Sequence, residues 1–231
     1  MGEALGRLLT ARGHDVVFSA RASRARLEDV ARRLAADGHG ARVIDADLRD
    51  PSRCRALVAE AHAWRGRLDL LVCLASVYQR VPFDEITPEV WRDHLAVDLD
   101  ASFHCAHAAA ALMAGAGSGH IILSADWVAA SGRPRYTGYV PYYVAKAGVV
   151  ALAEGLALEL AASGVRVNAI APGPILPAAG TSAADHEAVL AATPLGRWGT
   201  PGALADAVGA LLDASFVTGE ALRVDGGRHL A

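Results

Sequence analysis

Residues 120–170 carry the pattern that decides the fold. HIIL at 120–123 and RVNAI at 166–170 are short, mainly apolar runs that resemble buried strands, and PYYVAKAGVVALAEGLALELAA at 141–162 has the length and apolar spacing of a helix. A helix between two such strands allows them to lie parallel in one sheet. These residues therefore predict a strand-helix-strand unit.

The same alternation extends in both directions along the chain. Further strands are expected at Val16–Phe18, Ala41–Asp45, Leu70–Leu74 and Ala221–Val224. Helices are expected at Gly2–Arg12, Leu27–Leu34, from Pro51, from Pro88 towards Met113 and over most of Leu190–Leu212. The pattern predicts one α/β domain over residues 1–231: a doubly wound, Rossmann-like, mostly parallel sheet with helices on both faces. Ligands of such sheets bind beyond the carboxyl ends of the strands.

Composition limits the partners. The 231 residues are 53% hydrophobic and 20% charged, without an apolar run of the ~18 residues that span a bilayer, so we expect a soluble protein with no membrane partner. No leader is recognisable, which predicts a cytoplasmic location. A net charge of -3 without a basic stripe argues against nucleic acid and for a small-molecule substrate. Three cysteines and the scattered histidines lack ligand spacing, so we expect reduced, buried thiols and no metal.

Tyr142 and Lys146 are the strongest candidates for catalysis. They lie four residues apart on the predicted helix, so both side chains reach the same small volume. We expect the ammonium to lower the pKa of the phenol from about 10, making a general acid/base. The alternative is an exposed lysine beside an interfacial tyrosine. Among 22 Lys and Arg residues Lys146 is the only lysine, which favours a task that a guanidinium performs poorly.

The motif Tyr-x-x-x-Lys after a strand resembles the short-chain dehydrogenase/reductase family. Further segments resemble its loop over the nicotinamide and its C-terminal signature, and these are Arg166–Gly173, Val217–Gly219 and Val224–Gly227. The resemblance implies a nicotinamide-dependent oxidoreductase. In this family the tyrosine exchanges a proton with the substrate oxygen, the lysine also binds the nicotinamide ribose, and the cofactor moves a hydride.

The resemblance also implies cofactor contacts. Asp47 and Leu48 correspond to the adenine contact, although an acidic residue there is often only a turn former or cap. Arg21 and Ser23 stand where an acidic residue would bind the ribose of NAD, and the arginine suits the 2′-phosphate of NADP unless it is simply solvated. NADP(H) is therefore expected rather than NAD. The other expected cofactor contacts are Gly2, Leu74, Ala75, Ser76, Tyr142, Lys146, Pro172, Gly173 and Ile175.

The N-terminal end departs from the family. Gly2, followed by Ala4 and Leu5, resembles the last glycine of the loop Thr-Gly-x-x-x-Gly-x-Gly, and nothing corresponds to the first, central strand or to most of that loop. A sheet without its central strand leaves edges unpaired in the core. We therefore expect that the start is misassigned or shortened, that Met1 corresponds to an internal methionine, and that the cofactor site as written is incomplete.

Two carboxylates replace family residues near the catalytic pair. Asp98 aligns with an asparagine of the long helix, and Asp126 with the serine that usually binds the substrate carbonyl, although Ser124 could take that place. With Tyr78 after Ala75-Ser76, Asp126 resembles the pteridine reductase branch, in which an aromatic ring stacks on the pterin. A partly buried Tyr78 with a satisfied hydroxyl is the equal alternative.

Three functions follow as hypotheses. The first is an NADPH-dependent reductase of a pteridine-like heterocycle, with Tyr142 and Asp126 supplying the proton and Tyr78, Asp126 and Tyr142 contacting the substrate; Asp98 completes the catalytic set. The second is a ketone, 3-oxoacyl or polyol carbonyl reductase of the same family. The third is a non-catalytic cofactor-binding protein. The resemblance implies a homodimer or homotetramer built on the long helices.

Overall fold

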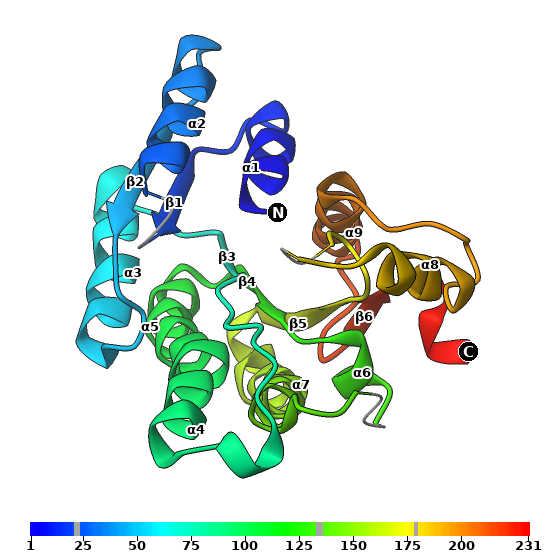
Figure 1. Cartoon of the computed structure of the whole chain (residues 1–231). Coiled ribbons are helices and arrows are strands. Elements are labelled where there is room, and N and C mark those ends of the chain that lie inside the picture. Colours follow the sequence, from blue (N-terminus) through cyan, green and yellow to red (C-terminus); the bar gives the residue numbers. More distant parts are fainter. Residues whose placement is uncertain (21–23, 133–135, 178–179) are drawn as a thin grey trace.

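A computed structural model (Figure 1) describes residues 1–20, 24–132, 136–177 and 180–231. Strands and helices alternate through these residues. The strands are β1 (Val16–Ala20), β2 (Ala41–Asp45), β3 (Leu70–Cys73), β4 (Gly119–Ser124), β5 (Val165–Pro172) and β6 (Ala221–Val224). The helices are α1 (Gly2–Ala11), α2 (Arg24–Ala36), α3 (Pro51–Arg65), α4 (Pro88–Leu95), α5 (Ala101–Ala116), α6 (Trp127–Ala130), α7 (Val140–Leu160), α8 (Ala183–Ala191) and α9 (Pro201–Asp213). Short 3-10 turns η1 (Phe83–Glu85), η3 (Ala161–Ser163) and η4 (Arg228–Leu230) and a π-helical segment η2 (Ala96–Asp100) complete the chain.

All strand pairings among the described residues are parallel. β3, β4, β5 and β6 form one sheet in that order, and β4 lies against β5 with Ile121 opposite Val167. Helical crossovers connect the strands, as parallel neighbours require. The Rossmann-like α/β class predicted from the sequence is confirmed.

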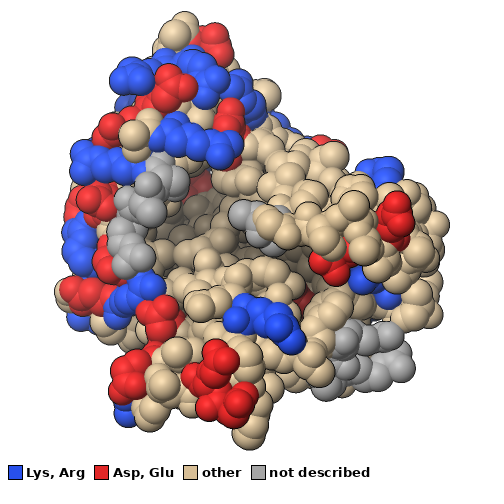
Figure 2. Space-filling model, in the orientation of Figure 1, with Lys and Arg blue, Asp and Glu red and all other residues tan. Residues whose placement is uncertain are grey.

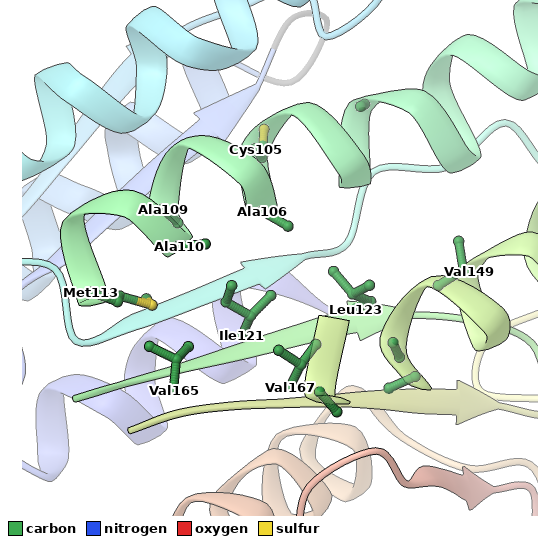
Figure 3. Packing of buried hydrophobic residues seen from close by; sticks show 14 of the residues in the cluster. Cys105, Ala106, Ala109, Ala110, Met113, Ile121, Leu123, Val149, Val165 and Val167 are labelled. Atoms are coloured by element: carbon green, nitrogen blue, oxygen red, sulfur yellow. The ribbon is translucent and has the colours of Figure 1, made fainter. Parts of the chain in front are cut away.

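The central strands β4 and β5 are buried on both faces of the sheet, because helices cover the side chains that alternate between the two faces. On β4, Ile121 and Leu123 pack against α5 and α7, as Figure 3 shows, while Ile122 belongs to a second cluster with α1, α2 and α9. On β5, Ile170 likewise joins the second cluster. Helices therefore cover both faces, as predicted.

Local signals fix the helix ends. Asp50 accepts a hydrogen bond from the Ser52 amide at 2.8 Å and so caps α3, which ends at Gly66 in the left-handed region at φ 69°. Thr87 and Thr200 cap α4 and α9 in the same way through their hydroxyl oxygens. Among the described residues, no helix is both long and apolar enough to cross a bilayer.

The described strands form two sheets. In these sheets β1 pairs only with β2, and β3 pairs only with β4, so that β1 and β3 do not pair with each other (Figure 1). A cavity of about 900 Å³ lies between β1 and β3. The cavity is lined by β1, β3, α1 and α5, with side chains such as Phe18, Val72 and Cys105. The expected single sheet is therefore interrupted, at the place where the sequence analysis expects a central strand.

Other sequence predictions need smaller corrections. Residues 192–200 are not helical and separate α8 from α9, because Pro194 and Gly196 stop the helical pattern of 190–212. The short helix α6 was not predicted, because four residues are too few to show helical periodicity. Cys54 and Cys105 are buried as expected, whereas Cys73 is only half-buried at the cavity between the sheets.

Candidate active site

Tyr142 and Lys146 lie in the first half of α7, one turn apart on the same face. The Lys146 side chain is fully buried, and its ammonium donates to the carbonyl of Ser124, at the end of β4, at 2.8 Å. Its Nζ lies 5.7 Å from the centre of the Tyr142 ring. The spacing that singled out this pair in the sequence thus brings both groups to the carboxyl end of β4.

Asp126 meets the tyrosine hydroxyl. Its Oδ2 accepts a hydrogen bond from the Tyr142 hydroxyl at 3.0 Å, and its Oδ1 caps α6 by accepting from the Val128 amide at 2.8 Å. Burial raises the pKa of Asp126, against the opposing effects of Val128, Tyr142 and Lys146. Asp126 contacts the phenol, whereas Ser124, the other candidate for the place of the family serine, accepts from Lys146 through its backbone carbonyl.

Asp98 forms an ion pair with Lys146. Its Oδ1 lies 3.1 Å from Nζ, with 2% of the lysine side chain and 0% of the aspartate side chain exposed. Both carboxylate oxygens also accept from the Val77 amide, at 3.3 and 3.1 Å. The π-helical segment η2 carries Asp98, and π turns within helices frequently occur at functional sites.

The expected lowering of the Tyr142 pKa is wrong for this structure. The pKa of Tyr142 is raised well above its usual value, first by burial, then by the charge of Asp126 and its hydrogen bond, and further by Asp98. The main physical reason is burial, which disfavours the charged phenolate, and the carboxylates of Asp126 and Asp98 raise the pKa of Tyr142 further. The protonated phenol is therefore strongly favoured.

An aromatic group that sequence reasoning largely missed surrounds the phenol. Tyr78 stacks on Tyr139 with ring centres 4.9 Å apart and meets Tyr142 edge-on at 5.0 Å. Tyr136 and Trp127 extend the row, each edge-on to its neighbour. Tyr78 is 54% exposed, so its ring is partly buried and still offers surface to a substrate, which leaves both readings of this residue open. Four tyrosines within residues 136–143 were the available signal.

The predicted cofactor contacts fall into two groups. Gly2, Leu48, Leu74 and Ala75 line the cavity between the two sheets, and Ser76 follows directly on the same loop. The second group, which lies at the ends of β5 and α7, is Pro172, Gly173, Ile175, Tyr142 and Lys146. Asp47 accepts from the backbone and guanidinium of Arg49, which fits the alternative reading of a turn former. Arg21 and Ser23 lie outside the described residues.

The two C-terminal motifs meet at Gly173. A Cβ there would lie 2.6 Å from Cα of Asp225, so the loop after β5 needs glycine to approach the end of β6. Asp225 is buried and accepts from the amides of Gly227 and His229, both at 3.0 Å. These bonds shape the C-terminal signature itself, and the Gly173 amide joins the loop after β5 to it by donating to the Val224 carbonyl at 3.0 Å.

The face drawn in Figure 2 is hollowed in its middle, and mostly uncharged residues border the hollow, while Lys and Arg gather mainly over α2 and α3. In the described part of the chain, no group of three or more His, Cys, Asp or Glu side chains could hold a metal ion.

Comparison with known proteins identifies the family. A family model described as enoyl-(acyl carrier protein) reductase matches residues 1–229. Cis-4-hydroxycyclohexanecarboxylate dehydrogenase of Sinomonas cyclohexanicum is 38% identical over 98% of this chain and 91% of its own length. The chain belongs to the short-chain dehydrogenase/reductase family. It is thus related to oxidoreductase enzymes that use NAD(P), and the reading as a non-catalytic protein has no support.

Further relatives span the whole chain. A 3-oxoacyl-[acyl-carrier-protein] reductase of Staphylococcus aureus (strain N315) is 30% identical over 100% of this chain and 94% of its own length. The crystal structure of a gluconate 5-dehydrogenase from Burkholderia cenocepacia J2315, in complex with NADP and tartrate, matches with a TM-score of 0.90 and 31% identity over 100% of this chain and 91% of that one. These short-chain dehydrogenases/reductases carry names for carbonyl and alcohol substrates.

Proposed function

We propose that this chain is an NADP(H)-dependent oxidoreductase that interconverts a secondary alcohol and a ketone, with Tyr142 exchanging the proton. The observation that carries the proposal is the Tyr142 hydroxyl, held at 3.0 Å by Asp126 one helical turn from the buried Lys146. A phenol in such a place is a general acid within reach of a substrate oxygen.

The residues present fit a nicotinamide cofactor. Lys146 donates to Ser124 and Asp98, and because an ammonium has three N–H groups it can bind one further acceptor, such as a ribose hydroxyl. Gly173 and Ile175 lie on the loop after β5, beside Asp225, where they would cover the ring. NADP rather than NAD is supported by Arg21 in the sequence and by the NADP held in the related gluconate 5-dehydrogenase.

The cofactor and the side chains of the site then have separate roles in the reduction of a ketone. When bound, the reduced nicotinamide supplies a hydride to the carbonyl carbon. Tyr142 donates its proton to the carbonyl oxygen, a role that its raised pKa suits because the phenol stays protonated at neutral pH. Asp126 orients the phenol, and when protonated it can itself donate a hydrogen bond to the substrate oxygen. Lys146 anchors the ribose side of the site.

The substrate class follows from the surroundings of the phenol. Exposed ring surface of Tyr78 beside Tyr139 suits an apolar or cyclic carbon skeleton. The named relatives include a dehydrogenase of a cyclic hydroxy acid and a 3-oxoacyl reductase. Cyclic ketones and 3-oxoacyl thioesters are therefore our first candidates.

A pteridine-like heterocycle is the second candidate, and Asp126 is the observation that favours it. A carboxyl group beside the phenol could relay a proton to a ring nitrogen, and Tyr78 could stack on a pterin. The relatives named above give this branch no support, so it ranks below carbonyl reduction.

A substrate panel separates the two candidates. Measuring kcat/KM with NADPH for a cyclic ketone, a 3-oxoacyl thioester and a dihydropteridine should rank a carbonyl substrate first, and NADPH should exceed NADH. Asp126→Ser should then lower dihydropteridine reduction more than ketone reduction, because serine keeps a neutral donor and removes the second acid. A dihydropteridine ranked first would replace the carbonyl proposal by the second candidate, and no turnover of any substrate would refute both.

We infer a homo-oligomer as the acting form. Large apolar side chains remain exposed on the two long helices: Phe103 on α5, and Val144 and Leu158 on α7. Such residues are candidates for a subunit interface. Sedimentation velocity should show a dimer or tetramer, and Leu158→Asp should shift the protein towards the monomer.

A further inference from the structure

The pair formed by Asp98 and Lys146 differs from an ordinary surface ion pair. Its atoms lie 3.1 Å apart, and the two side chains are 0% and 2% exposed. Solvent therefore screens neither charge, and each group responds mainly to the other and to its hydrogen-bond partners. The amide of Val77 and the carbonyl of Ser124 supply those partners.

The fold places Asp98 here through the π-helical segment. η2 lies between α4 and α5, and its residue Asp98 is fully buried against α7, while Asp100 two residues on is exposed. An inserted π turn changes which side chains face the neighbouring helix. The carboxylate is thus built into the site by the backbone of η2.

We propose that Asp98 is a positioning residue that neutralises Lys146, so that Lys146 can hold the cofactor ribose without stabilising the Tyr142 phenolate. This rests on the proposed function of Tyr142 as proton donor. Ionisation of the phenol, which reduction needs in its protonated form, then limits reduction only at alkaline pH. Alcohol oxidation, which needs the phenolate, is confined to alkaline pH.

The other titratable groups around the phenol reinforce this balance. Asp126 faces it from the turn before α6, Tyr78 from the loop after β3, and Tyr139 from the N-cap position of α7. Among the described residues that contact Tyr142, Lys146 is the only cation. With Asp98 paired to it, no net positive charge faces the phenol, in agreement with the raised pKa of Tyr142.

An amide in place of the Asp98 carboxylate would keep the hydrogen bond to Lys146 and remove the negative charge that neutralises the ammonium. In Asp98→Asn the amide oxygen can still accept from Lys146, but the ammonium charge then acts on the phenol at full strength. An opposite charge a few ångströms away lowers the pKa of an acid by about one to three units. The phenol of Tyr142 should shift downward by that amount.

The test measures phenol ionisation directly, in the protein without cofactor. Ultraviolet difference spectra recorded against pH give the titration of Tyr142 when the matching Tyr142→Phe spectrum is subtracted. Asp98→Asn should lower the apparent pKa by about one to three units, and Asp100→Asn, an exposed neighbour, should leave it unchanged. The double variant Asp98→Asn with Lys146→Gln restores a neutral pair and should return the titration close to wild type.

Turnover gives a second readout. The rise of alcohol oxidation with pH, which follows formation of the phenolate, should move to lower pH in Asp98→Asn by the same number of pH units. An unchanged or raised pKa of the Tyr142 phenol in Asp98→Asn, with the fold intact by circular dichroism, would overturn the proposal.

If Asp98→Asn does not fold, the single variant Lys146→Gln tests the proposal instead. The pKa of its Tyr142 phenol should be higher than in wild type, because no cation then neutralises Asp98. A lower pKa would overturn the proposal. Absence of turnover would refute the proposed function and leave the titration result valid.

Discussion

At the scale of single residues, the surroundings of Lys146 explain why this position carries a lysine when the other 21 of the 22 Lys and Arg residues are arginine. Its Nζ sits fully buried between the Ser124 carbonyl and Asp98. A guanidinium is wider and would displace one of these partners. We expect Lys146→Arg to lower kcat/KM by about 100-fold or more, the scale of a lost acid/base group. Steady-state kinetics, with urea unfolding as the control for fold, checks this; near-normal turnover would refute the role.

Asp126 should impose a pH limit on reduction. Burial raises the pKa of its carboxyl group, so the neutral form persists to higher pH than for an exposed aspartate. Above that pKa the carboxylate can only accept the hydrogen bond of the Tyr142 hydroxyl, and it repels the oxyanion that develops on the substrate, so kcat/KM for ketone reduction should fall as pH rises through it. In Asp126→Ser, whose hydroxyl can still cap α6, this fall of kcat/KM with rising pH should disappear, whereas Asp84→Ser should keep it. If the fall remains in Asp126→Ser, a group other than Asp126 causes it.

At the scale of elements, the ends of β5 and β6 depend on a glycine. A Cβ on Gly173 would approach the Asp225 backbone to 2.6 Å, whereas one on Gly202 would meet only the Thr200 hydroxyl at 3.5 Å. We expect Gly173→Ala to destabilise the protein by about 1 to 3 kcal/mol through overpacking and to weaken NADPH binding. Gly202→Ala is the control and should change neither. Urea unfolding and fluorescence titration measure both quantities, and equal behaviour of the two variants would contradict the prediction.

At the scale of the whole molecule, we expect the cavity between the two sheets to accommodate a further strand. Within the described residues, β1 and β3 present edges without strand partners across a cavity of about 900 Å³, whose lining includes apolar side chains such as Phe18 and Val72. An added parallel strand would pair both edges and bury apolar surface. We expect an engineered extension before Met1, an apolar strand of about five residues with a glycine turn, to raise the melting temperature and slow thiol modification of Cys73.

The control for this experiment is a Gly/Ser extension of equal length, which cannot supply apolar burial. Hydrogen exchange of the β1 and β3 amides should slow only with the apolar extension. Identical protection with both extensions would show that the cavity does not accept a strand.

The sequence by itself determined that strands and helices alternate and that helices cover both faces of the sheet. It also determined that Tyr142 and Lys146 lie one turn apart on the same helix. Apolar periodicity and four-residue spacing are local properties, and local patterns survive without knowledge of the fold. The family could be named from the same motifs. Boundaries at β1, β2 and β6 were close because Gly, Pro and polar clusters mark them.

Only the tertiary structure decided the electrostatics of the site. Asp98 and Lys146 are 48 residues apart in sequence, and their pairing depends on the packing of η2 against α7. The sequence showed a lysine near a tyrosine and suggested a lowered pKa, but the packing brought two carboxylates and burial that raise it. Charges separated along the chain act on one another through space, so their balance is set by packing, which no local pattern reveals.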